Sequence, residues 1–325
     1  MQRKLGRSGL EVSAMGMGCW AIGGPFWEGK DALGWSKVDD SESVKAIHCA
    51  LDFGINFFDT ADVYGAGHSE RVIGKALHSE RKNVIIATKF GNVFDEETKQ
   101  ITGNNASPDY ILNACDASLK RLNTDYIDLY QFHLNDFDPD KAGEVRDTLE
   151  SLVQSGKIRF YGWSTDFRER AQVFEQGEHC TAVQHQLNVL DDNNAVLDFC
   201  TEKNLASINR APLAMGLLTG KYNKNSQLGV DDVRGLKSPV WMKYFQKGRA
   251  ADEWLEKVES LRQILTIDGR SLVQGALGWL WGRSSKTIPI PGFKNVKQVE
   301  ENARAMEYGS LSEEQMLKIE EILER

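Results

Sequence analysis

Short apolar runs alternate with amphipathic stretches along most of the chain. The apolar runs cover residues 55–58, 84–87, 126–130, 158–161, 181–183, 205–208 and 287–290, and an earlier one lies near 13–18. Most are rich in β-branched or aromatic residues and are short enough to be buried strands. The pattern therefore predicts about eight strands, each bounded by helical or turn sequence.

The stretches between these runs carry helical periodicity. Val44, Ile47 and Leu51 share one helical face, and a similar spacing recurs over 112–122 and 145–153. Ser107 before Pro108 predicts a helix N-terminus, because serine caps the free N–H groups and proline suits the first helical position.

The end of the chain predicts one more helix. Ser312 and Gln315 have the spacing of a capping box. The expected apolar face of this helix consists of Met316, Ile319, Ile322 and Leu323.

Alternation of strands and helices over a whole chain predicts a parallel sheet. About eight units in 325 residues favour an α/β fold of the closed (β/α)8 or TIM-barrel type. We expect a β-hairpin over 2–13 that plugs the bottom of the barrel. We also expect extra C-terminal helices and a single domain spanning 1–325. The connection over 211–286 is unusually long, and its part 220–249 is interpreted as a functional loop.

Composition narrows the function classes. The chain has 39 Lys and Arg against 47 Asp and Glu, a formal charge of −8, which argues against general nucleic-acid binding. Five scattered cysteines without a C-x-x-C motif fit a reducing cytoplasm and no disulfide scaffold. No signal-peptide core, membrane-length apolar run or metal-ligand spacing is visible, so neither a membrane location nor a metal site is expected.

Polar side chains with acid–base chemistry follow three neighbouring strands. Asp59 and Tyr64 follow the run at 55–58, while Lys89 and His133 follow the next two runs. Strand ends of a barrel meet at one face, so these four groups can converge. An ammonium group beside a phenol favours the phenolate and lowers its pKa, which suits proton donation to a carbonyl oxygen.

At these residues the chain resembles the aldo-keto reductases. FDTADVYG at 58–65, ATKFG at 87–91 and YQFH at 130–133 look like the active-site signatures of that family, in the same order. The resemblance runs from LGRSGLEVSAMGMGCW near the start to IPIPGFKNVKQVEEN near the end. It implies a barrel enzyme that uses NADPH to reduce aldehydes and ketones, with the hydride coming from C4 of the nicotinamide.

The resemblance also implies catalytic roles. Tyr64 would be the general acid, Lys89 and Asp59 would tune it, and His133 would position the carbonyl group. GLLTGKY at 216–222 is similar to the long-loop branch that includes general stress reductases and potassium-channel β subunits.

No G-x-G-x-x-G follows a strand, so a dinucleotide would lie across the barrel mouth and not in the Rossmann manner. The residues that the resemblance implies as cofactor contacts are Gly18, Cys19, Trp20, Ser164, Gln184, Arg210, Pro212, Leu213, Gly216, Leu218, Gly220, Lys221, Gly292, Lys294, Gln298, Glu301 and Asn302. Lys294 next to a helix start suits a 2′-phosphate and favours NADP over NAD. Trp27 and Phe90 are the expected substrate-pocket residues.

Four positions depart from the family pattern. Thr165 stands where relatives often have Asn, Cys19 where they have Thr, and Gln298 where some have Arg. Arg210 stands where many relatives place an aromatic ring stacked on the nicotinamide. A guanidinium plane can also stack, but its charge is expected to perturb hydride transfer, in a direction that the sequence leaves open.

Two other functions remain open from the sequence. A Schiff-base aldolase on the same barrel would use Lys89 as its nucleophile. Alternatively, the chain could sense NADP(H) and regulate a protein partner. A carbonyl substrate is the expected small-molecule partner, and the sequence does not indicate an oligomeric state.

Overall fold

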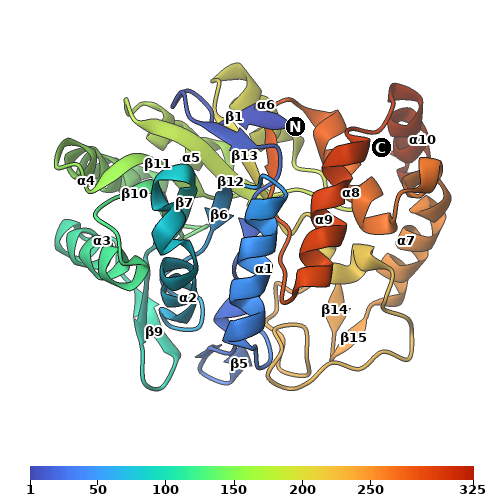
Figure 1. The fold of residues 1–325 in the computed structure, drawn as a ribbon, viewed down its shortest axis with the longest axis horizontal. Helices are drawn as coiled ribbons and strands as arrows, with labels where there is room; N and C mark the ends of the chain where they lie inside the picture. The colour runs from blue at the N-terminus through green and yellow to red at the C-terminus, as the bar shows by residue number, and fades with distance from the viewer.

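The structure, a computed structural model, describes residues 1–325 and places eight parallel strands at the centre of a ring of helices (Figure 1). In spatial order the strands are β16 (Thr287–Pro289), β13 (Ala206–Arg210), β12 (Cys180–Gln186), β11 (Ile158–Ser164), β10 (Ile127–Phe132), β7 (Ile85–Phe90), β6 (Phe57–Asp59) and β3 (Met17–Gly18). The amides of Gly16 and Gly18 donate to the carbonyl oxygens of Pro289 and Pro291, both at 3.0 Å, and so join the two ends of this sheet. The predicted (β/α)8 barrel is confirmed.

Most central strands extend further toward their carboxyl ends than the apolar runs indicated. Strand β7 continues through Lys89 to Phe90, and β11 continues through Ser164. Lys89 therefore lies inside a strand and not after it. Burying it there is possible because Asp59, on the neighbouring strand β6, supplies a counter-charge.

The barrel interior is built in layers because alternate side chains of each strand point inward. The lowest layers are apolar and consist of Phe57, Ile85, Ala87, Leu129, Ala182, Ala206, Ile208, Ile288 and Ile290. The residues two positions further along several of these strands are polar and form the next layer, toward the mouth. This alternation directs the polar side chains described below into the same space.

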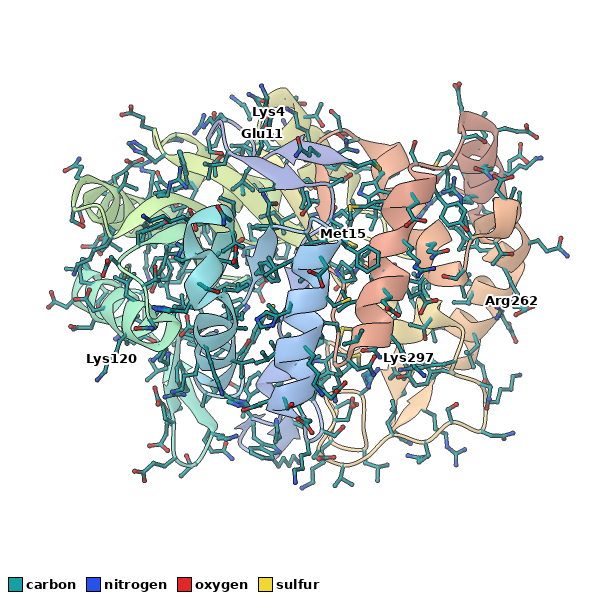
Figure 2. All side chains as sticks on the ribbon, in the orientation of Figure 1. Lys4, Glu11, Met15, Lys120, Arg262 and Lys297 are labelled. Carbon is teal, nitrogen blue, oxygen red and sulfur yellow. The ribbon has the colours of Figure 1, made fainter.

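The N-terminal hairpin closes the opposite end of the barrel. Strands β1 (Gln2–Lys4) and β2 (Glu11–Ser13) pair antiparallel, as predicted, and Lys4 and Glu11 mark them at the top of Figure 2. Leu5 and Val12 are buried against the lowest apolar layer of the barrel. The hairpin thus fills the barrel bottom.

Ten α-helices surround the strands (Figure 1). They are α1 (Asp40–Asp52), α2 (His68–Leu77), α3 (Pro108–Leu122), α4 (Ala142–Gln154), α5 (Arg168–Glu175), α6 (Asn194–Glu202), α7 (Asp252–Leu265), α8 (Leu272–Arg283), α9 (Val296–Tyr308) and α10 (Glu313–Leu323). Ser107 caps α3, and Ser312 with Gln315 forms the capping box of α10, both as predicted. Of the expected apolar face of α10 only Ile319 is fully buried, because this last helix lies at the periphery of the barrel.

Two features at the barrel mouth were not predicted. Strands β4 (Trp27–Glu28), β5 (Asp31–Ala32), β8 (Asn92–Asp95) and β9 (Gln100–Asn104) form a separate four-stranded sheet. Within the long connection, β14 (Phe245–Gln246) and β15 (Arg249–Ala250) form a small hairpin. The segment 220–249 runs along this mouth beneath α9 in Figure 1. None of the helices is both long and apolar enough to cross a membrane.

Candidate functional site

A buried lysine links a carboxylate to a phenol at the barrel mouth. The Nζ atom of Lys89 donates to Oδ1 of Asp59 at 2.5 Å and to the carbonyl oxygen of Thr60 at 2.7 Å. The same Nζ lies 3.3 Å from the hydroxyl of Tyr64. Lys89 is fully buried, so its charge reaches the phenol with little screening by solvent. The structure therefore brings together three of the four residues that the sequence placed at strand ends.

Asp59 is held by three donors from three different strands. Its Oδ1 accepts from Lys89, and its Oδ2 accepts from Nε2 of Gln131 at 2.9 Å and Nε2 of Gln184 at 2.8 Å. Gln131 and Gln184 are both buried, and they contact each other at 3.2 Å. This network fixes the carboxylate, and the carboxylate in turn fixes the ammonium group. Sequence reasoning missed Gln131, although its place two residues before His133 puts it on the same inward face of β10.

The pKa of Tyr64, beside Lys89, differs in part from the prediction. Burial raises the pKa of Tyr64 above its ordinary value, and the nearby Lys89 lowers it without overcoming the burial. For Lys89, burial acts to lower the pKa, but Asp59 and Tyr64 outweigh it, so the pKa is raised. The predicted lowering by the ammonium group is present, but burial outweighs it, so Tyr64 in the free site is less acidic than a free phenol. The ammonium limits a rise caused by burial and stays charged itself.

His133 follows β10 and faces the phenol. Its ring lies edge-on to that of Tyr64, with 5.8 Å between the ring centroids. Burial, together with the positive charges of Lys89 and Arg210, holds the pKa of His133 well below its usual range. The imidazole is therefore neutral, and its buried Nδ1 atom has no hydrogen-bond partner in the chain. A neutral imidazole has one N–H donor and one acceptor nitrogen, so a ring in this place can hydrogen-bond a small molecule beside Tyr64.

Aromatic side chains form one wall beside the phenol. The ring of Trp20 stacks on Tyr64 at 5.8 Å, and Trp241 of the long connection lies 6.5 Å from Trp20. Trp20 also meets Trp35 edge-on at 5.6 Å and donates its indole N–H to Leu33 at 3.1 Å. These rings give the mouth an apolar side next to its charged base.

The two residues expected to line a substrate pocket are placed differently. Phe90 is fully buried and stacks on Tyr130, with centroids 4.5 Å apart, in the outer core. Because strand side chains alternate, it points away from the face that carries Lys89, and its assignment to the pocket is wrong. Trp27 is partly buried on β4, whereas its neighbour Phe26 belongs to the apolar cluster around Tyr64. Phe26 is thus a mouth residue that the sequence reasoning missed.

The expected nicotinamide contacts lie at the ends of three barrel strands. Gly18 ends β3, and the thiol of the buried Cys19 donates to the carbonyl oxygen of Met17 at 3.4 Å. Ser164 ends β11 and pairs in register with Gln184 of β12. The amide nitrogen of Gln184 is committed to Asp59, so only its oxygen remains to accept from another molecule.

The segment after β13 has an unusual backbone. It holds the expected contacts Pro212, Leu213, Gly216, Leu218, Gly220 and Lys221. Ala214, Met215 and Gly216 have successive positive φ angles of 47°, 57° and 91°. Such a turn brings backbone groups close to whatever lies against it, and its left-handed residues need support from elsewhere.

Arg234 provides that support, and sequence reasoning missed it. Its Nη1 donates to the carbonyl oxygen of Met215 at 3.1 Å and to the hydroxyl of Tyr222 at 2.7 Å, while Nε and Nη2 each donate to Asp232 at 2.8 Å. The guanidinium carbon lies 4.3 Å from the centroid of the Trp35 ring. The only sequence signal is a single arginine two residues after an aspartate, which is not specific.

The segment before α9 and the first two turns of this helix hold the remaining candidates. Gly292 is exposed, and the Nζ atom of the half-buried Lys294 donates to the carbonyl oxygen of Ser36 at 3.1 Å. The side chain of Gln298 accepts from the backbone N–H of Lys294 at 2.7 Å and so orders the turn. Glu301 is exposed, whereas Asn302 is buried and its Nδ2 atom has no partner in the chain.

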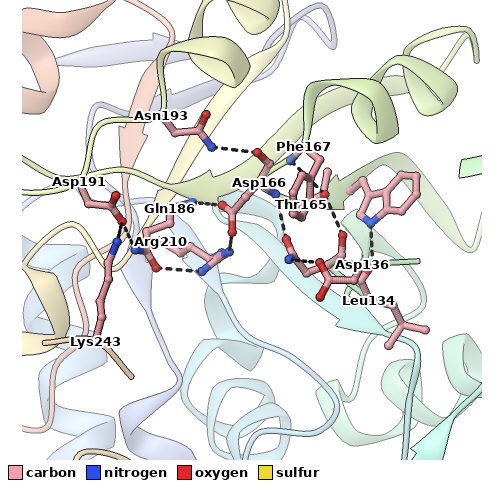
Figure 3. A network of polar contacts seen from close by, with 12 residues as sticks. Leu134, Asp136, Thr165, Asp166, Phe167, Gln186, Asp191, Asn193, Arg210 and Lys243 are labelled. Carbon is pink, nitrogen blue, oxygen red and sulfur yellow. Dashed lines mark hydrogen bonds and ion pairs between the residues drawn. The ribbon is translucent and has the colours of Figure 1, made fainter. Parts of the chain in front are cut away.

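Figure 3 shows how Arg210 is held at the end of β13. Its guanidinium forms an ion pair with Asp166, and its Nη1 donates to Oε1 of Gln186 at 3.3 Å. Gln186 also contacts Asp191, which pairs with Lys243 of the long connection at 2.6 Å. This chain of contacts connects the strand ends to the segment 220–249.

The polar groups between the barrel mouth and α9 fit a bound dinucleotide. Two buried polar atoms, Nδ1 of His133 after β10 and Nδ2 of Asn302 in the second turn of α9, have no partner in the chain. Between these elements in the chain lies the positive-φ turn over 214–216, which permits close approach to phosphate. Lys294 adds a half-buried cation, whose pKa is lowered by burial. A ligand with a polar head at the barrel mouth and an anionic stretch toward α9 would match these features.

The fold and site define a class: parallel β/α barrels that carry a buried lysine–aspartate pair beside a tyrosine hydroxyl at the barrel mouth. Residues 14–324 match the Aldo/keto reductase family, and the chain belongs to that family.

Individual relatives agree with this assignment. The chain is 33% identical over 317 residues to the aldo-keto reductase yakc of Schizosaccharomyces pombe, whose name includes NADP(+), covering 94% of this chain and 86% of the relative. It is 32% identical over 300 residues to aldo-keto reductase YhdN of Bacillus subtilis, covering 90% of this chain and 85% of the relative. Among solved structures, a glycerol dehydrogenase from Gluconobacter oxydans superposes with a TM-score of 0.83 at 30% identity, covering 99% of this chain and 94% of the other.

Proposed function

We propose that this protein reduces aldehydes or ketones to alcohols with NADPH and uses Tyr64 as the general acid. The observation that carries the proposal is the 3.3 Å contact between the Tyr64 hydroxyl and the buried ammonium group of Lys89. A phenol in this position can give its proton to an oxygen atom on which negative charge develops, because the adjacent cation stabilises the phenolate that remains.

The other residues of the cluster assist this proton transfer. Asp59, held by Gln131 and Gln184, keeps Lys89 charged and fixed in place. The neutral imidazole of His133 can donate a hydrogen bond to the same carbonyl oxygen and orient it toward Tyr64. Trp20 covers the phenol ring and excludes water from one side of it.

NADP is proposed as the cofactor because membership of the aldo-keto reductase family is expected to imply NADPH and the yakc relative carries NADP(+) in its name. Lys294 would read the 2′-phosphate, the 214–220 turn supported by Arg234 would hold the pyrophosphate, and Asn302 would meet the adenine. When bound, the reduced nicotinamide supplies the hydride. The protein residues only position it and handle the proton.

The substrate is proposed to be a small carbonyl compound. The Gluconobacter neighbour is a glycerol dehydrogenase, so the carbonyl compounds that glycerol yields on losing two hydrogens belong in a first substrate panel.

A cytoplasmic location is also proposed. All five cysteines are unpaired, and four of them are buried, which supports this location.

The Schiff-base alternative is opposed by the state of Lys89. Imine formation needs an unprotonated amine. The pKa of Lys89 is raised, and its Nζ is occupied by Asp59 and Thr60. No structural feature favours the alternative of a regulatory NADP(H) sensor over the enzyme.

The test is a titration of the purified protein with NADPH and NADH by quenching of protein fluorescence, followed by a carbonyl panel with the preferred cofactor. We expect tighter binding of NADPH and turnover of at least one carbonyl compound. Tight NADPH binding with negligible turnover over a broad panel would support the sensor instead. Borohydride trapping of a substrate on Lys89 would support the aldolase.

A further inference from the structure

Arg210 shares the inner face of the barrel with the catalytic cluster. Ala206 and Ile208 of β13 lie in the apolar layers inside the barrel. Arg210 follows at the next alternate position, so its side chain emerges at the mouth on the same face. Its positive charge acts to lower the pKa values of Tyr64 and His133, in keeping with a guanidinium at the same mouth.

The position of the nicotinamide follows from the chemistry of the proposed reaction. A carbonyl oxygen that contacts Tyr64 and His133 places its carbon within a few ångströms of them, and the hydride donor must lie about 3–3.5 Å from that carbon. The redox-active ring is therefore confined to the mouth between the Tyr64–His133 pair and the strand ends that carry Ser164, Gln186 and Arg210. The inference below rests on this proposed placement.

Arg210 and Asp166 form a fixed pair of opposite charges at this place. The carboxylate of Asp166 pairs with the guanidinium and also accepts from the backbone N–H of Gln186 at 2.7 Å (Figure 3). The guanidinium is held on its other side by Oε1 of Gln186 at 3.3 Å. Both side chains are about one-third exposed, at 32% and 29%, so a molecule entering the mouth can contact them without unfolding the strand ends.

The two charges act in opposite ways on a nicotinamide ring. The oxidised ring carries a positive charge and the reduced ring does not. A nearby cation destabilises the oxidised form relative to the reduced form, and a nearby anion does the reverse. We propose that the Arg210–Asp166 ion pair sets the redox balance of the bound cofactor, Arg210 disfavouring the oxidised ring and Asp166 offsetting that effect.

This proposal gives a direction to the effect of Arg210 on hydride transfer. A cation that weakens binding of the oxidised cofactor makes the bound reduced cofactor a weaker hydride donor. The reaction then shifts toward alcohol oxidation. Asp166 restores the driving force for carbonyl reduction. The combined effect of the two charges, and not Arg210 alone, therefore determines the equilibrium between carbonyl reduction and alcohol oxidation on the enzyme.

The experiment compares Arg210→Met and Asp166→Asn by measuring the dissociation constants of NADPH and NADP+ by fluorescence titration without substrate. In Asp166→Asn the cation is unopposed, and we expect the ratio of the NADP+ constant to the NADPH constant to rise roughly fivefold. In Arg210→Met the anion is unopposed, and we expect the ratio to fall by a similar factor. A tenfold change in this ratio corresponds to about 30 mV in the potential of the bound couple.

The double variant Arg210→Met with Asp166→Asn removes both charges and is expected to return the ratio to within about twofold of the wild type. If the pair had only a structural role, both single variants would weaken the two cofactor forms equally and leave the ratio unchanged, which would overturn the proposal. Shifts of the same sign in both variants would also overturn it. If the wild type binds neither cofactor form, the proposed function itself fails, so the two failures are distinguishable.

Discussion

The ammonium group of Lys89 lies 3.3 Å from the hydroxyl of Tyr64, although 25 residues separate them in the chain. The two side chains come from β7 and from the turn after β6, and the parallel pairing of these strands brings them to the same end of the barrel. The burial that raises the pKa of Tyr64 is thus opposed by a cation that the barrel itself holds in place.

Removing the Tyr64 hydroxyl tests its proposed role as proton donor. We expect Tyr64→Phe to lose nearly all carbonyl reduction, because the variant lacks the hydroxyl group that is proposed to give its proton to the carbonyl oxygen. NADPH binding is expected to survive, since the ring and its stacking on Trp20 remain. Steady-state rates and a fluorescence titration check the two parts separately. Comparable reduction rates in the wild type and the variant would refute the assignment.

The pH dependence tests the influence of Lys89 on the phenol. Carbonyl reduction needs the protonated phenol and is expected to decline only as pH rises through the Tyr64 pKa, which burial places above its ordinary value. Alcohol oxidation needs the phenolate and is expected to increase over the same range. Because Lys89 lowers this pKa, Lys89→Met is expected to move both transitions to higher pH. Profiles of kcat/KM in both directions measure the shift, and unchanged transition positions would contradict it.

The Asp59–Lys89 pair also predicts a stability effect. Lys89→Met leaves the buried Asp59 carboxylate without its counter-charge, which costs about 3–5 kcal/mol of unfolding free energy. The double variant Lys89→Met with Asp59→Asn removes the stranded charge and should recover a large part of that loss. Urea unfolding followed by circular dichroism measures both. A double variant no more stable than Lys89→Met would show that the stranded carboxylate is not the cause.

The sequence allowed the barrel and the proximity of the four catalytic candidates to be predicted, because both follow from strand order. The contacts around Asp59 could not be predicted, since Gln131 and Gln184 come from two further strands whose register the sequence does not reveal. Phe90 was misplaced for an avoidable reason. Strand β7 extends beyond its apolar run, and alternation from the inward Lys89 turns Phe90 outward.

The support of the 214–216 turn was also invisible in the sequence. Arg234 lies 19 residues after Met215 and reaches it only because the long connection folds back along the mouth. A loop without periodicity gives no indication of such a return path. The pairing of the β4–β5 hairpin with β9 was missed for a similar reason, since these short strands carry few apolar residues.

Arg234 yields a prediction for cofactor affinity. Arg234→Met removes the hydrogen bond to the Met215 carbonyl and loosens the positive-φ turn, so the NADPH dissociation constant should rise about tenfold, in line with losing one charge-assisted hydrogen bond. The rate constant of the bound complex should change little, since Tyr64 and Lys89 are untouched. The variant also strands the buried Asp232. Arg234→Met combined with Asp232→Asn is the control, and full recovery of affinity there would contradict a role for the Met215 contact.

Lys294 is predicted to discriminate between the two dinucleotides. Its half-buried Nζ donates to the Ser36 carbonyl, which holds the cation near the start of α9, where helix N–H groups also favour an anion. Lys294→Ala should raise the dissociation constant of NADPH about tenfold and that of NADH far less, because only NADPH carries the 2′-phosphate. Lys297, exposed in the first turn of the same helix (Figure 2), is the matched control, and Lys297→Ala should leave both constants nearly unchanged. Fluorescence titrations with the two cofactors measure the ratio, and equal changes for NADPH and NADH in Lys294→Ala would show that this lysine does not read the 2′-phosphate.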